Sequence, residues 1–280
     1  MFKSICTTAT VLAMALVLAA CGSSDGGTTV QAQGVPASNN NIVVAGSTTV
    51  APIAQSLADA FMATYSQYNV EVQSMGTGAG MTAAIEGVAD IGLASRNLNA
   101  DELTALGYET FAIDGLAVIV HYSNPITNLS FDDIRGIFLG DITNWAEVGG
   151  DSGEIIVVSR ESGSGARGAF ESMADVVDDV FYSLIGTGSN GVLTSVEQNS
   201  NAIGYVTYGL IADRNVSSVA VDGTVFSGEA AANGSYPFAI GFHMAFQLAG
   251  VNDATQSFLN WVMSPAGQAV VAAEEYVPVR

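Results

Sequence analysis

The sequence predicts an α/β protein made of two α/β domains with mainly parallel sheets. Short apolar segments rich in β-branched residues alternate with segments of helical periodicity, as in folds where helices cover a parallel sheet. Several apolar segments end in small polar residues, and ligands in such folds bind where strand ends meet helix starts. The length of 280 residues is sufficient for one large domain or two smaller ones.

The N-terminal segment predicts a bacterial lipoprotein signal peptide over residues 1–20. Lys3 supplies a positive charge, and residues 9–20 are apolar but too few for a typical membrane span. The sequence Leu-Ala-Ala-Cys-Gly resembles a lipoprotein cleavage signal that ends at Cys21, which becomes the lipidated first residue. The alternative is an ordinary signal peptide with an incidental cysteine. Residues 21–41 are rich in Gly, Ser, Thr, Asn and Gln, which predicts a flexible tether.

Composition excludes several classes of function. The formal net charge of −20 argues against binding to nucleic acid or to an anionic membrane surface. Lys3 lies in the leader, so the mature chain has no lysine for a Schiff base or a P-loop. Cys6 is lost with the leader, and one mature chain then cannot form an internal disulfide. His121 and His243 have no second metal-type ligand at a short helical spacing, and we expect neither a metal nor a cofactor.

The first part of the chain predicts three strands that each lead into small polar residues. We expect these strands at residues 42–45, 70–73 and within 90–96. Pro52 suits the first turn of a helix whose face is marked by residues at helical spacing, Ile53, Leu57, Phe61 and Thr64. A second, short helix is expected through Met81, Ala84 and Ile85.

The remaining chain continues the alternation. Residues 111–122 predict a long apolar strand that contains Asp114, an acidic residue that must be at an edge, paired or functional. Ser130 can cap a helix that ends near Gly140. Further strands are expected at residues 202–206, 216–221 and 238–246, and closing helices at residues 256–263 and 265–273.

Residues 155–170 predict a site for a tetrahedral anion. An apolar run ends at Arg160, passes through a Ser/Gly turn and enters a helix, whose first N–H groups and dipole favour an anion. Ser162 and Ser164 can donate hydroxyls, and Arg160 can supply a forked charged donor. The alternative is a serine-rich turn that only caps an ordinary helix. Arg167 can face the anion or pair with Glu171 four residues later.

From residue 42 to the C-terminus the chain resembles the PstS-type phosphate-binding proteins of bacterial ABC importers. The resemblance is carried in order by eight segments, residues 46–52, 76–80, 90–96, 114–115, 137–145, 160–165, 202–205 and 264–268. It implies a type II periplasmic-binding-protein fold, with two lobes joined by two crossing hinge strands. The first lobe would comprise residues 42–117 plus 237–280, and the second lobe residues 118–236.

The resemblance also implies a function and its partners. The protein would bind inorganic phosphate between its lobes, without catalysis, and deliver it to the permease subunits of an ABC phosphate importer. It would be an exported monomer that is anchored to the cell membrane through lipid on Cys21. The alternatives are a binding protein for sulfate, tungstate or arsenate, a phosphatase or serine hydrolase using Ser164, or an adhesion or sensory protein.

The resemblance assigns ligand-binding roles residue by residue. The implied phosphate-binding residues are Thr48, Thr49, Thr77, Gly78, Ser95, Arg96, Arg160, Ser164, Gly165 and Ala166. Four further candidates are Ser47, Asp114, Glu161 and Ser162.

The sequence departs from the family pattern at two places. Ala166 stands where threonine is usual, so the loop loses a hydroxyl and keeps the backbone N–H. Ser95 and Arg96 stand where some members have an aspartate that accepts the phosphate proton. Because sulfate carries no such proton, a carboxylate acceptor would favour phosphate over sulfate. Asp114 and Glu161 are the candidate acceptors.

Overall fold

The computed structural model describes residues 40–177 and 179–280. The predicted signal peptide, Cys21 and the predicted tether up to residue 39 lie outside the described residues. Within the two described ranges, no helix is long and apolar enough to cross a membrane.

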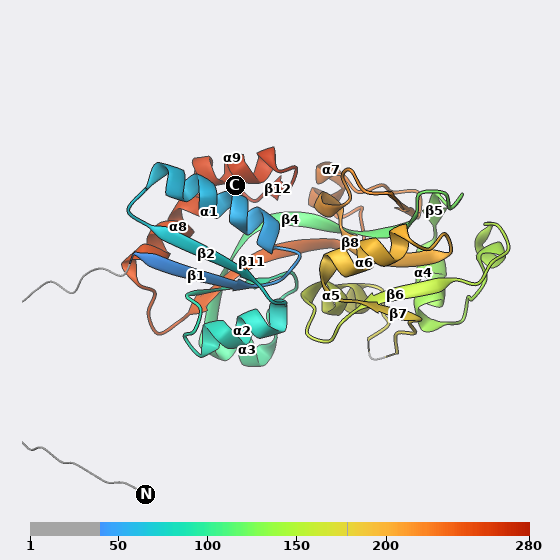
Figure 1. The fold of residues 1–280 in the computed structure, drawn as a ribbon, viewed down its shortest axis with the longest axis horizontal. Coiled ribbons are helices and arrows are strands. Elements are labelled where there is room, and N and C mark those ends of the chain that lie inside the picture. The colour runs from blue at the N-terminus through green and yellow to red at the C-terminus, as the bar shows by residue number, and fades with distance from the viewer. Residues whose placement is uncertain (1–39, 178) are drawn as a thin grey trace, which may run out of the picture. The chain divides into compact units, whose positions relative to one another are not determined.

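The first lobe contains three parallel strands, with β1 between β2 and β3 (Figure 1). Helices from both ends of the chain pack together there, since Phe61 contacts the rings of Phe258 and Trp261. Ile53 is buried as the helical spacing predicts, whereas Thr64 is exposed. The elements are β1 (Asn41–Gly46), α1 (Ala51–Thr64), β2 (Asn69–Ser74), α2 (Thr77–Ile85), β3 (Ile91–Ala94), α3 (Ala100–Ala105), α8 (Asp253–Val262) and α9 (Pro265–Ala273).

The second lobe repeats this arrangement with β6 between β7 and β8, all parallel. Ser130 caps the predicted helix at its start. The helix ends before Gly140, and Gly140 has a left-handed backbone conformation. The elements are α4 (Phe131–Leu139), the 3-10 helix η1 (Trp145–Val148), β6 (Ile156–Arg160), α5 (Gly165–Met173), β7 (Leu184–Gly186), α6 (Gly188–Glu197), β8 (Ala202–Thr207), the 3-10 helix η2 (Tyr208–Leu210) and α7 (Gly228–Ala232).

Two long strands, β4 (Leu106–His121) and β11 (Ala239–Gln247), run between the lobes (Figure 1). β4 pairs with β11 from residue 106 to residue 115 and with β8 from residue 116 to residue 120, in both cases antiparallel. Ten strands of the described chain thereby form one sheet, whose main order is β2-β1-β3-β11-β4-β8-β6-β7. The predicted two-lobed type II fold is confirmed, but the pairings at the centre of the sheet are antiparallel.

The sequence placed several boundaries differently. β4 begins at Leu106 rather than at residue 111, because residues 106–110 pair with the end of β11. The strand predicted at residues 216–221 divides in two, and β7 and α6 were not predicted. The remaining short strands are β5 (Asn128–Leu129), β9 (Val216–Ser218), β10 (Ala220–Val221) and β12 (Val277–Pro278).

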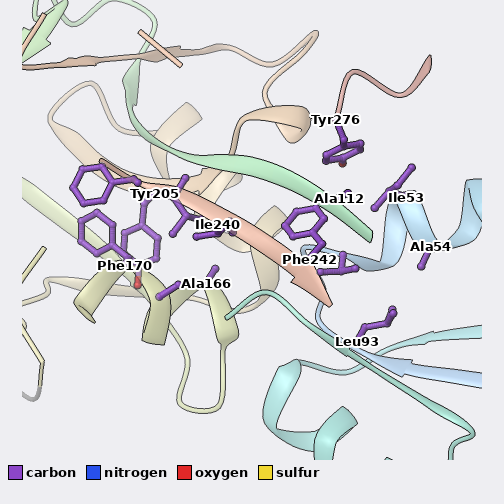
Figure 2. Packing of buried hydrophobic residues seen from close by; sticks show 14 of the residues in the cluster. Ile53, Ala54, Leu93, Ala112, Ala166, Phe170, Tyr205, Ile240, Phe242 and Tyr276 are labelled. Carbon is purple, nitrogen blue, oxygen red and sulfur yellow. The ribbon is translucent and has the colours of Figure 1, made fainter. Parts of the chain in front are cut away.

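An aromatic cluster fixes α5 against the second-lobe sheet (Figure 2). Phe170 of α5 stacks on Tyr205 of β8 with ring centroids 4.1 Å apart and planes 7° apart, and Phe138 of α4 lies 4.6 Å from Phe170. The Tyr205 hydroxyl reaches the Ser159 hydroxyl at 3.1 Å and accepts the Arg160 N–H at 3.4 Å. These contacts therefore fix the end of β6 and the helix α5, the two elements on either side of the turn that was predicted to bind an anion.

Candidate anion-binding site

Three hydroxyls of the first lobe meet where β1, β2 and β3 end. Ser47, Thr77 and Ser95 are each exposed by 2% or less. Ser47 Oγ accepts the N–H groups of Thr49 and Val50 and donates to Ser95 Oγ at 2.9 Å. Thr77 Oγ1 accepts the Ser95 N–H at 3.4 Å and lies 3.5 Å from Ser95 Oγ. Ser95 Oγ thus accepts from Ser47, and Thr77 Oγ1 accepts the Ser95 N–H. One of the two hydroxyl protons can serve the bond between Ser95 and Thr77, which leaves the other for another acceptor.

The lobes contact each other directly around these hydroxyls. In this region three hydrogen bonds cross from one lobe to the other, joining Arg160 to Thr48, Ser189 to Thr49, and Gly78 to Gly163. Arg160 Nη2 donates to Thr48 Oγ1 at 3.0 Å, and the Gly78 N–H donates to the Gly163 carbonyl at 3.0 Å. The structure therefore brings together the first-lobe and second-lobe loops that the sequence singled out.

Arg160 is buried at the end of β6, and four of its five side-chain N–H donors have acceptors. Its Nε and Nη2 donate to the two Glu161 oxygens at 2.8 and 2.9 Å, and its Nη1 donates to Ser189 Oγ at 3.3 Å. Glu161 also accepts the Gly188 N–H at 3.1 Å. Burial raises the pKa of Glu161, but the bonds from Arg160 outweigh that effect and leave its pKa below the usual value. Glu161 is therefore the counter-ion of Arg160.

The start of α5 presents backbone donors beside this arginine. Ser164 is the N-cap and its hydroxyl accepts the Arg167 N–H at 3.2 Å. Gly165 and Ala166 are buried in the first turn, where backbone N–H groups have no partner within the helix. Ser162 is exposed. Arg167 pairs with Glu171, which confirms one of the two predicted roles of Arg167.

Gly165 of α5 packs tightly against the first lobe. A Cβ at this position would meet Thr77 Oγ1 and lie 2.6 Å from Ser95 Oγ, far inside van der Waals contact. The fit across the two lobes therefore depends on a glycine here. Glycine is required because there is no room for a side chain. Its backbone is not in the left-handed region, so conformational freedom is not the reason.

Arg96 is next to the hydroxyls in sequence but is held by another partner. Its Nη1 and Nη2 each donate to Glu102 at 2.8 Å, and Glu102 also completes the capping box of α3 with Asn99. Burial raises the pKa of Glu102, but the Arg96 bonds outweigh it and lower the pKa. Arg96 borders a cavity of about 220 Å³ between α5 and β11.

Asp114 lies in β4 and bonds to the backbone of the second lobe. It is 1% exposed, and its two oxygens accept the N–H groups of Gly115 at 2.7 Å and Gly209 at 3.4 Å. Burial raises its pKa to about 7. Its negative charge also contributes to the raised pKa values of Tyr236 and Tyr276, so Asp114 faces a group of buried tyrosines.

Ser189 was not predicted from the sequence. It is 4% exposed and lies in the first turn of α6, where its hydroxyl contacts both Arg160 and Thr49. A usable signal was present, because Thr-Gly-Ser-Asn-Gly at residues 187–191 is another small-residue turn between a strand and a helix.

The described residues contain no group of three or more His, Cys, Asp or Glu side chains that could hold a metal ion. Burial lowers the pKa of His243 to about 4, and its Nδ1 bonds to Thr110 Oγ1 at 2.9 Å. His121 is partly buried and its Nδ1 lies 2.7 Å from Ser123 Oγ.

Two lobes with hydrogen-bond donors converging between them define a type II solute-binding protein. The PBP superfamily domain matches residues 23–266, and the chain belongs to this superfamily. Within it, the chain belongs to the PstS-type family of substrate-binding proteins of phosphate ABC transporters.

Solved structures and a curated relative support this membership. A Clostridium perfringens structure with bound phosphate, assigned as a phosphate ABC transporter substrate-binding protein, has 36% identity and a TM-score of 0.83, over 86% of this chain and 100% of that chain. An ABC-type phosphate transport receptor from Vibrio cholerae has 32% identity and a TM-score of 0.72, over 84% and 99% of the two chains. The phosphate-binding protein PstS of Bacillus subtilis is 26% identical over 95% of this chain and 91% of its own length.

The Gly165 contact leads to a first prediction. Gly165→Ala should weaken phosphate binding at least about 100-fold, because the added methyl group prevents α5 from approaching Thr77 and Ser95. The free energy of unfolding should change by no more than about 1 kcal/mol, since alanine is the better helix former. Calorimetric titration and thermal melting measure the two effects.

Gly168→Ala is the matched control on the same helix. A Cβ there would lie 3.5 Å from Arg96 Cδ, an ordinary contact, so affinity should stay within about threefold of wild type. Equal phosphate affinities for the two variants would contradict the steric fit assigned to Gly165.

Asp114 leads to a pH prediction. The folded protein holds a proton on Asp114 up to about pH 7, whereas the unfolded chain loses it near the ordinary aspartate pKa of 3.8. Stability therefore falls as the pH rises between these values. Asp114→Asn should be more stable than wild type at about pH 8, by at most about 4 kcal/mol, and should lose this advantage near pH 4. Denaturant unfolding at both pH values measures the difference.

The control is Asp151→Asn, an exposed aspartate whose replacement should leave the pH profile unchanged. A pH-independent difference between wild type and Asp114→Asn would show that Asp114 does not titrate in this range. The same variant tests the predicted proton acceptor, since an unchanged preference for phosphate over sulfate excludes Asp114 from that role.

Proposed function

We propose that this protein binds inorganic phosphate between its two lobes and delivers it to an ABC-type phosphate importer. The proposal rests on one observation. Buried Arg160, the start of α5 and the first-lobe hydroxyls meet across the interlobe contact, and all of them can donate hydrogen bonds. Its membership in a family with phosphate-bound members supports phosphate as the ligand.

The proposed ligand contacts come from both lobes. In the first lobe they are Thr48, Thr49, Thr77, the Gly78 N–H and Ser95, with Ser47 supporting Ser95. In the second lobe they are Arg160, Ser164 and the N–H groups of Gly165 and Ala166. Charge-assisted hydrogen bonds of this kind contribute about 1.5–3 kcal/mol each. Arg96 and Ser162 are assigned peripheral positions, because Arg96 is paired with Glu102 and Ser162 faces solvent.

The acceptor for the phosphate proton is the unusual part of the proposal. Glu161 is held as the counter-ion of Arg160 and also accepts from Gly188, and Asp114 is held by the N–H groups of Gly115 and Gly209, so each carboxyl group already has a structural role. We therefore expect a hydroxyl, with Ser95 the first candidate, to accept the hydrogen bond from the phosphate O–H. A hydroxyl is not repelled by sulfate as a carboxylate is, so the preference for phosphate should be smaller than in a carboxylate-containing site.

The cellular setting is part of the same proposal. Residues 1–20 would direct export and Cys21 would carry the lipid that holds the protein at the outer face of the cell membrane. Residues 42–117 with 237–280 and residues 118–236 would move as two lobes of a monomer that docks on permease subunits. The Ser164 hydroxyl is used as a helix cap, which favours stoichiometric binding over hydrolysis by this serine.

Calorimetric titration of the mature protein with phosphate, sulfate, arsenate and tungstate at two pH values tests the function. We expect micromolar or tighter phosphate binding at a stoichiometry of one, with weaker sulfate binding. Arg160→Lys should weaken phosphate binding at least about 100-fold, because an ammonium group cannot replace a planar guanidinium that bonds in several directions.

Arg214→Lys is the matched control, since Arg214 pairs with Glu197 in the second lobe. Tightest binding of another oxyanion would change the ligand assignment. No binding of any of the four would refute the transport function and favour an adhesive or sensory role.

The charge balance leads to a prediction about rates. The net charge of −20 repels a phosphate dianion, and this repulsion acts over about 30 Å at 0.01 M salt but only about 8 Å at 0.15 M. The association rate should therefore increase several-fold over this range, while the dissociation rate changes little because the contacts are buried. Stopped-flow binding measures both rates, and an association rate that falls with salt would contradict the argument.

A further inference from the structure

We propose that Ser189 is a positioning residue that links the orientation of Arg160 to closure of the two lobes. The inference rests on the proposed phosphate function and assigns a role to a residue of α6, outside the loops of β1, α2 and α5. Ser189 occupies the second position of this ten-residue helix and is 4% exposed.

Ser189 has hydrogen-bond partners in both lobes. Its Oγ accepts from Arg160 Nη1 at 3.3 Å within the second lobe and lies 3.1 Å from Thr49 Oγ1 of the first lobe. A guanidinium can only donate, so Ser189 accepts that bond and its own proton is available to Thr49. The hydroxyl thereby forms a continuous path from the buried charge to the opposite lobe.

The surroundings fix Ser189 in this position. The N-cap residue Thr187 makes no side-chain capping bond, and Glu161 instead accepts the Gly188 N–H at 3.1 Å. The carboxylate that neutralises Arg160 therefore also satisfies the start of α6, where a negative charge is favoured by the helix dipole. Arg160, Glu161 and Ser189 thus form one network.

Closure brings this network to two neighbouring residues of the first lobe. Arg160 reaches Thr48 while Ser189 reaches Thr49, so adjacent threonines bond to adjacent members of the same network. Glu161 stays bonded to Arg160 through its own lobe and does not depend on closure. Ser189 is therefore a second hydroxyl, besides Thr48, through which the guanidinium orientation and the closed arrangement stabilise each other.

Ser189→Ala should raise the Kd for phosphate about 10- to 30-fold, the size expected for losing one hydrogen bond to a charged group. Most of the change should be a faster dissociation rate, because closure delays release. Titration calorimetry gives the Kd, and release of radiolabelled phosphate during a chase with unlabelled phosphate gives the dissociation rate. Ser189→Thr, which keeps the hydroxyl, should restore the Kd to within about threefold of wild type.

A double-mutant cycle with Thr49→Val separates this role from a structural one. Ser189→Ala should cost several-fold less in the Thr49→Val background, because the interlobe bond is already lost. Ser195→Ala, whose hydroxyl bonds only to the Gly191 carbonyl of the same helix, is the control and should bind like wild type. Additive effects, or a Kd for Ser189→Ala within twofold of wild type, would overturn the proposal.

The outcomes distinguish this proposal from the function on which it rests. A wild-type protein that does not bind phosphate refutes the proposed function. A wild-type protein that binds phosphate, with a Ser189→Ala variant that binds equally well, refutes only the role of Ser189. A loss of affinity that comes with a large loss of thermal stability and is not restored by Ser189→Thr would also overturn it.

Discussion

The burial of one guanidinium constrains the rest of the site. Arg160 is 1% exposed, and an unpaired buried charge would cost several kcal/mol, so the surrounding chain must supply partners for it. Glu161 neutralises it, Ser189 and Thr48 each accept a further bond, and Tyr205 fixes its backbone. Because Glu161 is its neighbour in sequence, Arg160 keeps a counter-ion even when the lobes separate. Opening therefore breaks the bond from Arg160 to Thr48 but leaves the guanidinium paired with Glu161.

Arginines outside the site are also paired with carboxylates, and this bears on how a strongly acidic protein can bind an anion. Five of the arginines in the described chain form ion pairs, namely Arg96, Arg135, Arg160, Arg167 and Arg214. Affinity must then come from directed hydrogen bonds and the α5 dipole rather than from an excess of positive charge. Such bonds depend on geometry, which explains why the aromatic stack beneath α5 and the fit at Gly165 matter for binding.

The sequence predicted the local parts of this arrangement better than the long-range ones. The turn after Arg160 was recognised because an apolar run, a Ser/Gly segment and a helix follow each other directly. The proposed role of Ser189 depends on its contact with Arg160, which lies 29 positions away in the sequence, and a local sequence pattern cannot predict such a contact. The resemblance assigned Arg96 to the ligand, and the structure adds a partner for it, Glu102 of the capping box that begins at Asn99. The early start of β4 likewise depends on pairing with β11, over 130 residues later.

In the proposed function, closure of the lobes and ligand binding are one thermodynamic event, and this limits how strong the interlobe contacts can be. Three hydrogen bonds join the lobes around the first-lobe hydroxyls. The two neutral ones contribute about 0.5–1.5 kcal/mol each and the one from Arg160 about 1.5–3 kcal/mol. Contacts that stabilised closure much further would close the protein without ligand and slow both entry and release. Contacts that were much weaker would leave only a small fraction of the protein closed. The apparent Kd would then rise, because it equals the Kd of the closed form divided by that fraction. Neutral hydroxyl pairs such as Thr49 and Ser189 suit this requirement, because a charged pair across the same gap would bind too strongly when formed and be left unpaired when broken.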